Sequence, residues 1–278
     1  MRMRDSDCVV VGGGPAGLTA AYYLRRFHRS VACLDDGDSR ALRIGWTRNY
    51  PAFPKGIAGS ELVNRLAKQL EKAGGHVVSE HVSKIEAVDG GFVVQAGAMT
   101  TRARSILLAT GTRDLEPAVQ GMEEVRAKEL LRQCPICDGF EYTGKRIVVI
   151  GKGDHGVREA EFLRTYSSDV LLVDIAAPPR RMEHCAAGIA VSLADGTRTE
   201  CDVVYVALGS SPKSELAAAL GAAIDESGNI VVGLHCDTSV PGLFAAGDVV
   251  AGLDQLAVAT GHGATAATAM HNYLRSMG

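Results

Sequence analysis

The sequence of 278 residues predicts an α/β protein with two nucleotide-binding halves. Two glycine-rich loops lead to this prediction, at residues 12–17 and 151–156. Each loop follows a short apolar run and precedes a segment with helical periodicity. A strand, a tight glycine turn and a helix in that order form the Rossmann-like unit of parallel sheets. We therefore expect two such halves in one chain and no array of short repeats.

Composition narrows the class of protein further. Hydrophobic residues make up 46% of the chain and charged residues 22%, and the formal net charge is only -3. These values are typical of a globular protein and provide no basic surface for nucleic acid or an anionic membrane. Residues 1–4 are basic, but no long apolar run follows them. We therefore expect no signal peptide, no transmembrane segment and a cytoplasmic location.

The first half is expected to alternate strands and helices. Apolar or alternating runs indicate strands, and apolar stripes at helical spacing indicate helices, as at Leu62, Leu66 and Leu70. On this basis we expect helices at residues 18–27 and 59–73 and strands at residues 8–11, 30–34, 77–78, 82–88, 92–96 and 104–111, the last ending in a small-residue turn.

The second half is expected to begin after a linker. Residues 114–133 contain no strong strand pattern and are expected to hold the linker and a helix. The proline pair Pro178-Pro179 indicates a loop at residues 176–181. Beyond these, we expect strands at residues 146–150, 169–173 and 203–206 and helices at residues 156–166 and 263–277.

The first glycine loop has the features of a dinucleotide site. Gly12, Gly14 and Gly17 follow an apolar strand, and Asp35 ends the next strand. The glycines let the backbone approach a pyrophosphate, and the helix N-terminus offers N–H groups to it. The carboxylate, about 20 residues on, is placed to accept a hydrogen bond from a ribose hydroxyl. A purely structural glycine turn is the weaker alternative.

Cys134 and Cys137 are the most informative pair of residues. Two cysteines separated by two residues can close a small, reducible disulfide, and beside a βαβ pattern they indicate redox chemistry. A structural disulfide is the alternative. Asp138 and Gly139 follow directly, where an aspartate is either an acid–base group or an ordinary turn residue. No second cysteine pair accompanies them, so we expect no metal site.

The other cysteines have a different interpretation. The chain has 7 cysteines, an odd number, and they do not resemble the disulfide framework of a secreted protein. Cys8, Cys33 and Cys201 lie in apolar runs and are expected to pack in the core. Cys185 and Cys236 lie in less regular segments and are candidates for exposed thiols.

In this order, the motifs resemble those of the low-molecular-weight thioredoxin reductases, which are class II, FAD-dependent pyridine-nucleotide-disulfide oxidoreductases. The resemblance covers nearly the whole chain. Its most specific part is Cys-x-x-Cys-Asp-Gly between two glycine loops. The matching segments are residues 12–18, 49–54, 109–111, 134–139 and 244–248.

The resemblance implies two Rossmann-like, three-layer ββα domains, the second inserted in the first. Residues 1–114 and 239–278 would form the FAD-binding domain, and residues 115–238 the NAD(P)-binding-like domain with the cysteine pair. It also implies a homodimer. The residues implied to bind FAD are Gly12, Gly14, Pro15, Ala16, Gly17, Asp35, Asn49, Val82, Thr110, Gly111, Gly247, Asp248, Gln255, Leu256 and Ala257.

The resemblance also implies the roles of the redox residues. Cys137 would face the flavin and form the charge-transfer thiolate, and Cys134 would exchange disulfides with the substrate. Asp138 would carry the proton to or from the departing thiolate. The substrate would be a thioredoxin-like protein or a small-molecule dithiol. One departure lies nearby, because Asp254 stands where the family usually has arginine.

The second half departs from that family more clearly. Thioredoxin reductases carry a His-Arg-Arg run after the second strand of this unit, and its arginines bind the 2′-phosphate of NADPH. This chain has Asp174, Ile175 and Ala176 at the matching place. An arginine fork suits a phosphate, whereas a carboxylate repels it. The segment after Asp174 also looks shortened, and Lys152 and His155 replace small residues in the loop.

Three interpretations of nicotinamide use remain open. Asp174 could bind the ribose of NADH. Arg180 or Arg181 could restore NADPH binding, which would leave an ordinary thioredoxin reductase. Nicotinamide binding could instead be lost, with electrons coming from another donor or leaving to oxygen or a quinone, as in the nicotinamide-independent branches, and we favour this interpretation. A non-catalytic flavin sensor is a further alternative, which the intact cysteine pair disfavours. The degenerate site comprises Gly151, Gly153, Gly156 and Asp174.

We expect the purified protein to contain FAD and no FMN. The Gly12, Gly14 and Gly17 loop with Asp35 serves a pyrophosphate and an adenosine ribose, which FMN lacks. Acid release of the pigment followed by chromatography identifies it. Recovery of FMN, or of no flavin after reconstitution, would contradict this prediction.

Overall fold

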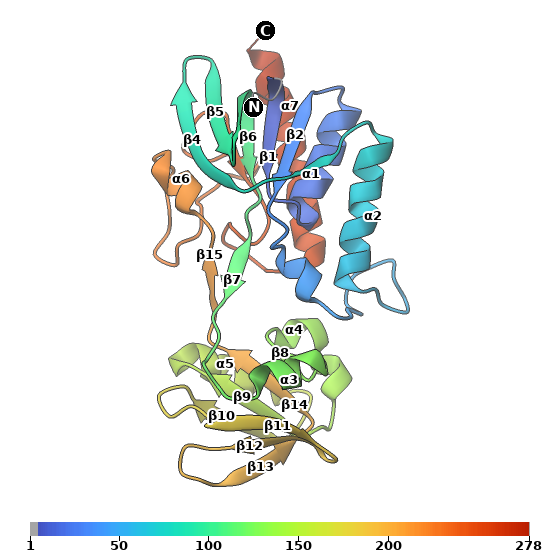
Figure 1. Cartoon of the computed structure of the whole chain (residues 1–278), viewed down its shortest axis with the longest axis vertical. Coiled ribbons are helices and arrows are strands. Elements are labelled where there is room, and N and C mark those ends of the chain that lie inside the picture. The colour runs from blue at the N-terminus through green and yellow to red at the C-terminus, as the bar shows by residue number, and fades with distance from the viewer. Residues whose placement is uncertain (1–4, 278) are drawn as a thin grey trace. The chain divides into compact units, whose positions relative to one another are not determined.

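The computed structural model describes residues 5–277, which form two compact units (Figure 1). The first unit contains residues up to Trp46, Tyr50–Arg113 and residues from Ser211 onward. The second contains Thr47–Asn49 and Asp114–Ser210. The chain passes from one unit to the other on each side of Thr47–Asn49, within β7 (Thr112–Asp114) and within β15 (Ser210–Pro212). β7 and β15 pair as a two-stranded sheet.

This division differs from the boundaries expected from sequence in residues 211–238. These residues were expected in the second domain, but they belong to the first compact unit. The short helix α6 (Glu215–Ala219) explains the difference. Its Ala217, together with Ile230, packs in the same core as Ile106 and Leu108 of the first sheet. Burial of these side chains attaches the segment to that core.

The first unit contains a seven-stranded mixed sheet. Its order is β3-β2-β1-β6-β5-β4, and β16 also pairs with β6. The pairs among β1, β2, β3, β6 and β16 are parallel, whereas β4, β5 and β6 form an antiparallel meander. The strands are β1 (Ser6–Val11), β2 (Val31–Asp35), β3 (Val77–Ser79), β4 (Val82–Val88), β5 (Gly91–Ala96), β6 (Met99–Leu108) and β16 (Leu243–Ala245).

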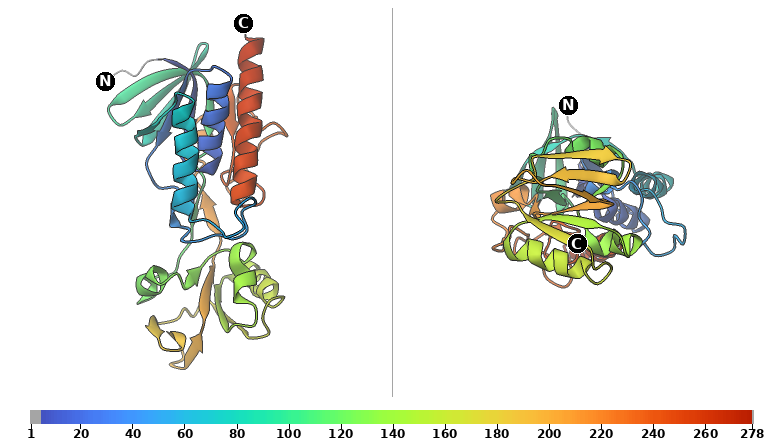
Figure 2. Two further views of the ribbon diagram at one scale, coloured as in Figure 1. Left: turned by 90° about the vertical axis from the view of Figure 1, so that its right-hand side faces the viewer. Right: turned by 90° about the horizontal axis from the view of Figure 1, so that it is seen from below.

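Three helices cover one face of the parallel strands. They are α1 (Pro15–Arg26), α2 (Gly59–Lys72) and α7 (Leu256–Ser276), and Figure 2 shows them side by side. Because successive strand residues point to opposite faces, Cys8 and Val10 of β1 pack toward the helices. Val9 and Val11 pack toward the meander on the other face. The sheet therefore has a core on each face, which accounts for its uninterrupted apolar strands.

Two helices in this unit begin earlier than the sequence pattern predicts. α1 begins at Pro15, inside the glycine loop, since proline suits the first turn of a helix. α7 begins at Leu256 and includes Gly261 and Gly263, which the sequence pattern placed before or at the helix start. Gly263 is needed within the helix because a Cβ there would lie 2.3 Å from the carbonyl oxygen of Ala16 in α1.

The second unit has a four-stranded parallel sheet in the order β10-β9-β14-β8. Its strands are β8 (Leu131–Arg132), β9 (Ile147–Gly151), β10 (Val170–Asp174) and β14 (Val203–Ala207), and its helices are α3 (Met122–Ala127), α4 (Pro135–Asp138) and α5 (Gly153–Leu163). The helix expected within residues 114–133 is therefore present as α3.

An antiparallel meander completes the second unit. It consists of β11 (Arg181–Cys185), β12 (Gly188–Ser192) and β13 (Arg198–Cys201). The sequence analysis assigned no strand between residues 174 and 203. Met182, Ile189 and Val191 of the meander are fully buried, so the short strands are fixed by packing against the parallel sheet. Within residues 5–277, no helix is long and apolar enough to cross a membrane.

Two glycines of α7 provide a matched stability test. We expect Gly263→Ala to lower the free energy of unfolding by about 1–3 kcal/mol, because the new Cβ overlaps the Ala16 carbonyl. In Gly261→Ala the new Cβ lies within 4 Å of no atom. This substitution should raise the free energy of unfolding by up to about 1 kcal/mol, since alanine is the better helix former. Urea unfolding of both variants measures the difference. Equal effects of the two substitutions would show that helix contact does not decide this position.

Candidate functional site

The two cysteines of the Cys-x-x-Cys motif form a disulfide in the second unit. Cys134 and Cys137 are joined with their Cα atoms 5.3 Å apart, across the first turn of α4. Pro135 is the first residue of that helix, where it loses no hydrogen bond. The amide of Cys137 donates to the carbonyl oxygen of Cys134 at 3.0 Å. The pairing expected from spacing is thus confirmed.

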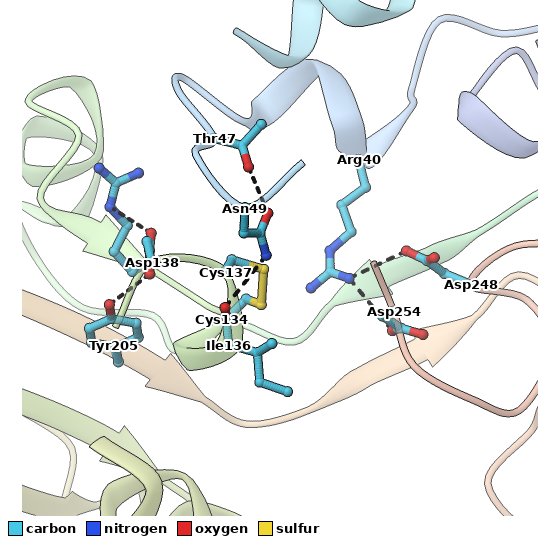
Figure 3. The surroundings of a disulfide bond; sticks show 11 residues. Arg40, Thr47, Asn49, Cys134, Ile136, Cys137, Asp138, Tyr205, Asp248 and Asp254 are labelled. Atoms are coloured by element: carbon cyan, nitrogen blue, oxygen red, sulfur yellow. Dashed lines mark hydrogen bonds and ion pairs between the residues drawn. A yellow bond between two sulfur atoms is a disulfide. The ribbon is translucent and has the colours of Figure 1, made fainter. Parts of the chain in front are cut away.

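Asn49 contacts the motif through its backbone. Its side-chain amide donates to the carbonyl oxygen of Ile136 at 3.5 Å, and the hydroxyl of Thr47 donates to Asn49 Oδ1 at 2.8 Å (Figure 3). This contact groups Thr47–Asn49 with the second unit. Asn49 was expected to bind the cofactor, and in the structure its side-chain amide contacts the turn between the two cysteines.

Apolar side chains are exposed next to the disulfide. Ile136, between the cysteines, is 49% exposed, and Phe140, in the following 3-10 turn at Gly139–Tyr142, is 75% exposed. Scattered apolar residues are common on protein surfaces, but these two adjoin a reactive bond. They provide an apolar surface against which a substrate can rest.

Asp138 is largely buried and doubly contacted. The hydroxyl of Tyr205 donates to Asp138 Oδ1 at 2.6 Å, and Arg132 Nε lies 3.2 Å from Oδ2. Burial raises the pKa of the Asp138 carboxyl, while the contacts with Tyr205 and Arg132 oppose that rise. A largely buried carboxyl group beside a redox disulfide is a candidate acid–base group. Neither Arg132 nor Tyr205 was identified from sequence.

The first glycine loop has a backbone geometry that only glycine allows. Gly12 has φ +108°, and a Cβ there would lie 2.3 Å from the Ala109 carbonyl oxygen. The amide of Gly13 donates to Asp35 Oδ1 at 2.7 Å, which joins the loop to the end of β2. No side chain of residues 5–277 makes a capping hydrogen bond to α1. The uncovered helix N-terminus beside a carboxylate fits a dinucleotide pyrophosphate and ribose.

The other residues expected at the cofactor site gather at one edge of the first sheet. Parallel strands end at the same edge. The glycine loop directly follows β1, Asp35 ends β2, and Thr110 and Gly247 lie two residues after the ends of β6 and β16. A Cβ on Gly247 would lie 2.9 Å from the Cβ of Ala16, so the two segments touch. Gly12, Gly14, Pro15, Ala16, Gly17, Asp35, Thr110, Gly111, Gly247 and Asp248 therefore share this edge.

Val82 and the start of α7 complete the expected set. Val82 begins β4 and is only 5% exposed, with its side chain in the core, so only its backbone is available to a ligand. Gln255 is the N-cap of α7, and Leu256 and Ala257 form its first turn. Asp254 precedes them and is half-buried.

Arg40 is a member of this edge that the sequence analysis missed. Its Nη1 lies 3.5 Å from Asp248 Oδ2 and 3.6 Å from Asp254 Oδ2 (Figure 3). The unusual acid at Asp254 thus faces a cation. The only sequence signal was the presence of two carboxylates in a segment expected to bind an anionic cofactor, which calls for a nearby positive charge.

The second glycine loop has a packing explanation of its own. A Cβ on Gly151 would lie 2.6 Å from the Cα of Gly156, so these glycines are needed for α5 to pack on β9 whether or not a nucleotide binds. Asp174 ends β10 and is exposed, and its Oδ1 accepts the Ala176 amide at 2.8 Å. Lys152 is exposed.

The two arginines considered as possible phosphate ligands have other partners. The guanidinium of Arg180 donates to the carbonyl oxygen of Ala194. Arg181 begins β11, and its Nε lies 3.4 Å from Glu183 Oε2. Both side chains therefore contact the β11–β13 meander and its loops.

The structure confirms that the three cysteines expected in the core are buried, and it corrects the expectation for Cys236. Cys8, Cys33 and Cys201 are buried, and burial raises the pKa of each thiol to about 12. Cys236, a candidate exposed thiol, is only 4% exposed, and burial raises its pKa to about 11. The expectation was wrong because its backbone pairs with Ala245 of β16 and its Sγ contacts the His262 carbonyl of α7. Cys185 is half-buried.

Comparison with known proteins gives a consistent result. The sequence profile of the pyridine nucleotide-disulphide oxidoreductases matches residues 6–187 and 178–263. The thioredoxin reductase of Bacillus subtilis (strain 168) is 29% identical over 306 residues, covering 98% of this chain and 95% of that protein. The thioredoxin reductase of Mycolicibacterium smegmatis is 30% identical, covering 88% of each chain. The crystal structure of thioredoxin reductase from Streptococcus pyogenes MGAS5005 has a TM-score of 0.89 at 26% identity, covering 98% of each chain.

We expect thiol labelling to separate the disulfide from the buried cysteines. After mild reduction, Cys134 and Cys137 should react with iodoacetamide at pH 8, because the thiolate is the reactive form. Cys8, Cys33 and Cys201 should stay unlabelled in the folded protein, since at a pKa of about 12 only about 10⁻⁴ of each is ionised. Peptide mass spectrometry reads the pattern. Labelling of Cys8 or Cys33 as fast as Cys134 would contradict it.

Proposed function

Because the chain belongs to the pyridine nucleotide-disulphide oxidoreductase family, we propose that it passes electrons between FAD and a dithiol through Cys134–Cys137, without depending on a nicotinamide. It is a thioredoxin-reductase-like, FAD-dependent disulfide oxidoreductase. The direction proposed is dithiol oxidation, with a two-electron acceptor such as oxygen or a quinone closing the cycle.

The position of the proposed cofactor residues, at the carboxyl ends of the parallel strands in the first unit, supports FAD binding there. The glycine loop and the uncapped N-terminus of α1 would hold the pyrophosphate, and Asp35 the adenosine ribose. Gly247 and Asp248 would hold the ribityl and phosphate end, and the first turn of α7 would approach the ring. When bound, FAD supplies the capacity to take up and give away an electron pair.

The cysteines and Asp138 carry the exchange chemistry. A substrate thiolate attacks Cys134, the bond between Cys134 and Cys137 breaks, and Cys137 leaves as a thiolate. The second substrate thiol then attacks its partner sulfur in the mixed disulfide, and Cys134 leaves. Asp138 accepts the proton of that second thiol. The exposed Ile136 and Phe140 support docking of a thioredoxin-like protein or an apolar dithiol.

The observation that carries nicotinamide independence is Asp174 at the end of β10. This position takes the arginine run in the reductases that use NADPH. Two unit charges about 4 Å apart interact by roughly 1 kcal/mol in water and about 4 kcal/mol near a protein surface. Changing attraction to repulsion therefore lowers the affinity for a 2′-phosphate by about tens-fold or more. Arg180 and Arg181 have other partners, which argues against a rescue.

A second candidate function is an NADH-dependent reductase. It is favoured by the equivalent positions of Asp174, at the end of β10, and Asp35, at the end of β2. In dinucleotide sites such an acid binds the ribose hydroxyls. Two other candidates are less well supported. The charge of Asp174 argues against an ordinary NADPH-dependent thioredoxin reductase, and the intact disulfide argues against a non-catalytic sensor. A homodimer is proposed from the family alone.

We expect dithiothreitol to reduce the bound flavin readily and both nicotinamides to reduce it slowly. Anaerobic stopped-flow absorbance with NADPH, NADH and dithiothreitol compares them directly. Cys134→Ser and Cys137→Ser should each abolish reduction by the dithiol. The triple substitution Asp174→His, Ile175→Arg and Ala176→Arg, which introduces the His-Arg-Arg run of the family, should increase the rate with NADPH at least tenfold.

The outcomes separate the candidates. Fast, saturable reduction by micromolar NADPH would assign the protein to ordinary thioredoxin reductases. Fast reduction by NADH alone would show that Asp174 binds the ribose. No reduction by any of the three would favour the sensor.

A further inference from the structure

Tyr205 and Arg132 are brought together by strand register in the second unit. β14 and β8 are parallel neighbours, and Tyr205 is the register partner of Arg132. Register partners project to the same face of a sheet, so the phenol and the guanidinium stand side by side. Asp138 follows β8 by a few residues and ends α4. Its carboxylate contacts both side chains, and Figure 3 shows the contact with Tyr205.

Each oxygen of the carboxylate has its own partner. Tyr205 Oη donates to Asp138 Oδ1 at 2.6 Å, and Arg132 Nε lies 3.2 Å from Oδ2. Tyr142 contacts both partners. Arg132 Nε donates to the Tyr142 hydroxyl at 3.3 Å, and the rings of Tyr142 and Tyr205 pack edge-on with centroids 6.1 Å apart. Tyr205 is fully buried, and the side chains of Arg132 and Asp138 are 20% and 18% exposed. Such burial makes both contacts stronger than surface pairs.

We propose that Arg132 and Tyr205 are positioning residues that hold the Asp138 carboxylate ionised and oriented as the proton acceptor for dithiol oxidation at Cys134–Cys137. This proposal rests on the proposed function and extends it to residues outside the cysteine motif. A hydroxyl donor and a guanidinium can both stabilise the anion, whereas a burial site without them would favour the neutral acid.

The charged groups around Asp138 support this role. Arg132 on β8 and Tyr205 on β14 lower the pKa of the carboxyl, while burial and Glu141 on the 3-10 turn raise it. Burial is the largest of these contributions. Removing either partner therefore leaves the rise from burial less opposed, and the pKa of Asp138 moves further upward.

With Asp138 as the proton acceptor, disulfide exchange accounts for both electrons and for the proton of the second substrate thiol. The substrate dithiol loses two electrons and gains an S–S bond, and the Cys134–Cys137 bond breaks and takes up those electrons. The proton of the second substrate thiol passes to the Asp138 carboxylate as its sulfur attacks the mixed disulfide. Below its pKa the carboxyl is already protonated and cannot accept, so the rate falls with decreasing pH.

The test is the pH profile of flavin reduction by dithiothreitol in Tyr205→Phe. All rates are divided by the wild-type rate at the same pH, so that ionisation of dithiothreitol cancels. Loss of the hydrogen bond from Tyr205 should raise the pKa of Asp138, because that bond stabilises the ionised carboxylate. The ratio should therefore fall at least tenfold on the acid side and approach 1 at high pH. Arg132→Met should behave likewise, and Arg132→Lys, which keeps the charge, should restore part of the rate.

Two further variants make the result decisive. Tyr166→Phe is the matched control, because Tyr166 lies in the same unit and its hydroxyl has no hydrogen-bond partner among the described residues, so its ratio should stay near 1 at every pH. Asp138→Asn should lower the rate and remove the pH dependence of the Tyr205→Phe effect in the double variant. A ratio for Tyr205→Phe that is independent of pH would overturn the positioning role. A wild-type profile in Asp138→Asn would instead overturn the role of Asp138 in the proposed function.

Discussion

β1 is hydrogen-bonded in parallel to β2 on one side and to β6 on the other, with Cys8 opposite both Val31 and Ser105. This double pairing brings the ends of three strands to one edge of the sheet. The glycine loop, Asp35 and Thr110 lie there because each stands at or just after the end of one of these strands, and Gly247 lies there because it follows β16. The candidate cofactor site therefore depends on the central strand pairing more than on any one contact within it.

In the second unit, parallel strand pairing brings together the residues around Asp138. β14 lies between β9 and β8, and the register with β8 sets Tyr205 beside Arg132. β8 ends at Arg132, and α4 begins at Pro135 and ends at Asp138. This short connection places Asp138 beside Arg132 and Tyr205. A buried carboxylate requires a cation or a donor, and here the sheet provides both. Arg40 provides the corresponding charge between Asp248 and Asp254 in the first unit.

The two glycine loops show why a motif alone does not define a ligand. In the first loop, the Gly13 amide contacts the acid at the end of the neighbouring strand, and the helix N-terminus is left without a side-chain cap. In the second, Gly151 and Gly156 are already required by the close approach of α5 to β9. Glycines needed for packing persist even if a nucleotide is no longer bound, so the charge of Asp174 is the more informative feature.

The sequence by itself determined the features that depend on short stretches of chain. These are the two strand–glycine–helix units, the Cys134–Cys137 disulfide and the burial of Cys8, Cys33 and Cys201, because apolar runs and turn residues act locally. Only the tertiary structure decided the others. Gly263 lies inside α7 because α1 packs closely on it, and Cys236 is buried between β16 and α7. The β11–β13 meander and the partners Arg40, Arg132 and Tyr205 depend on contacts between residues far apart in sequence, which local patterns do not encode.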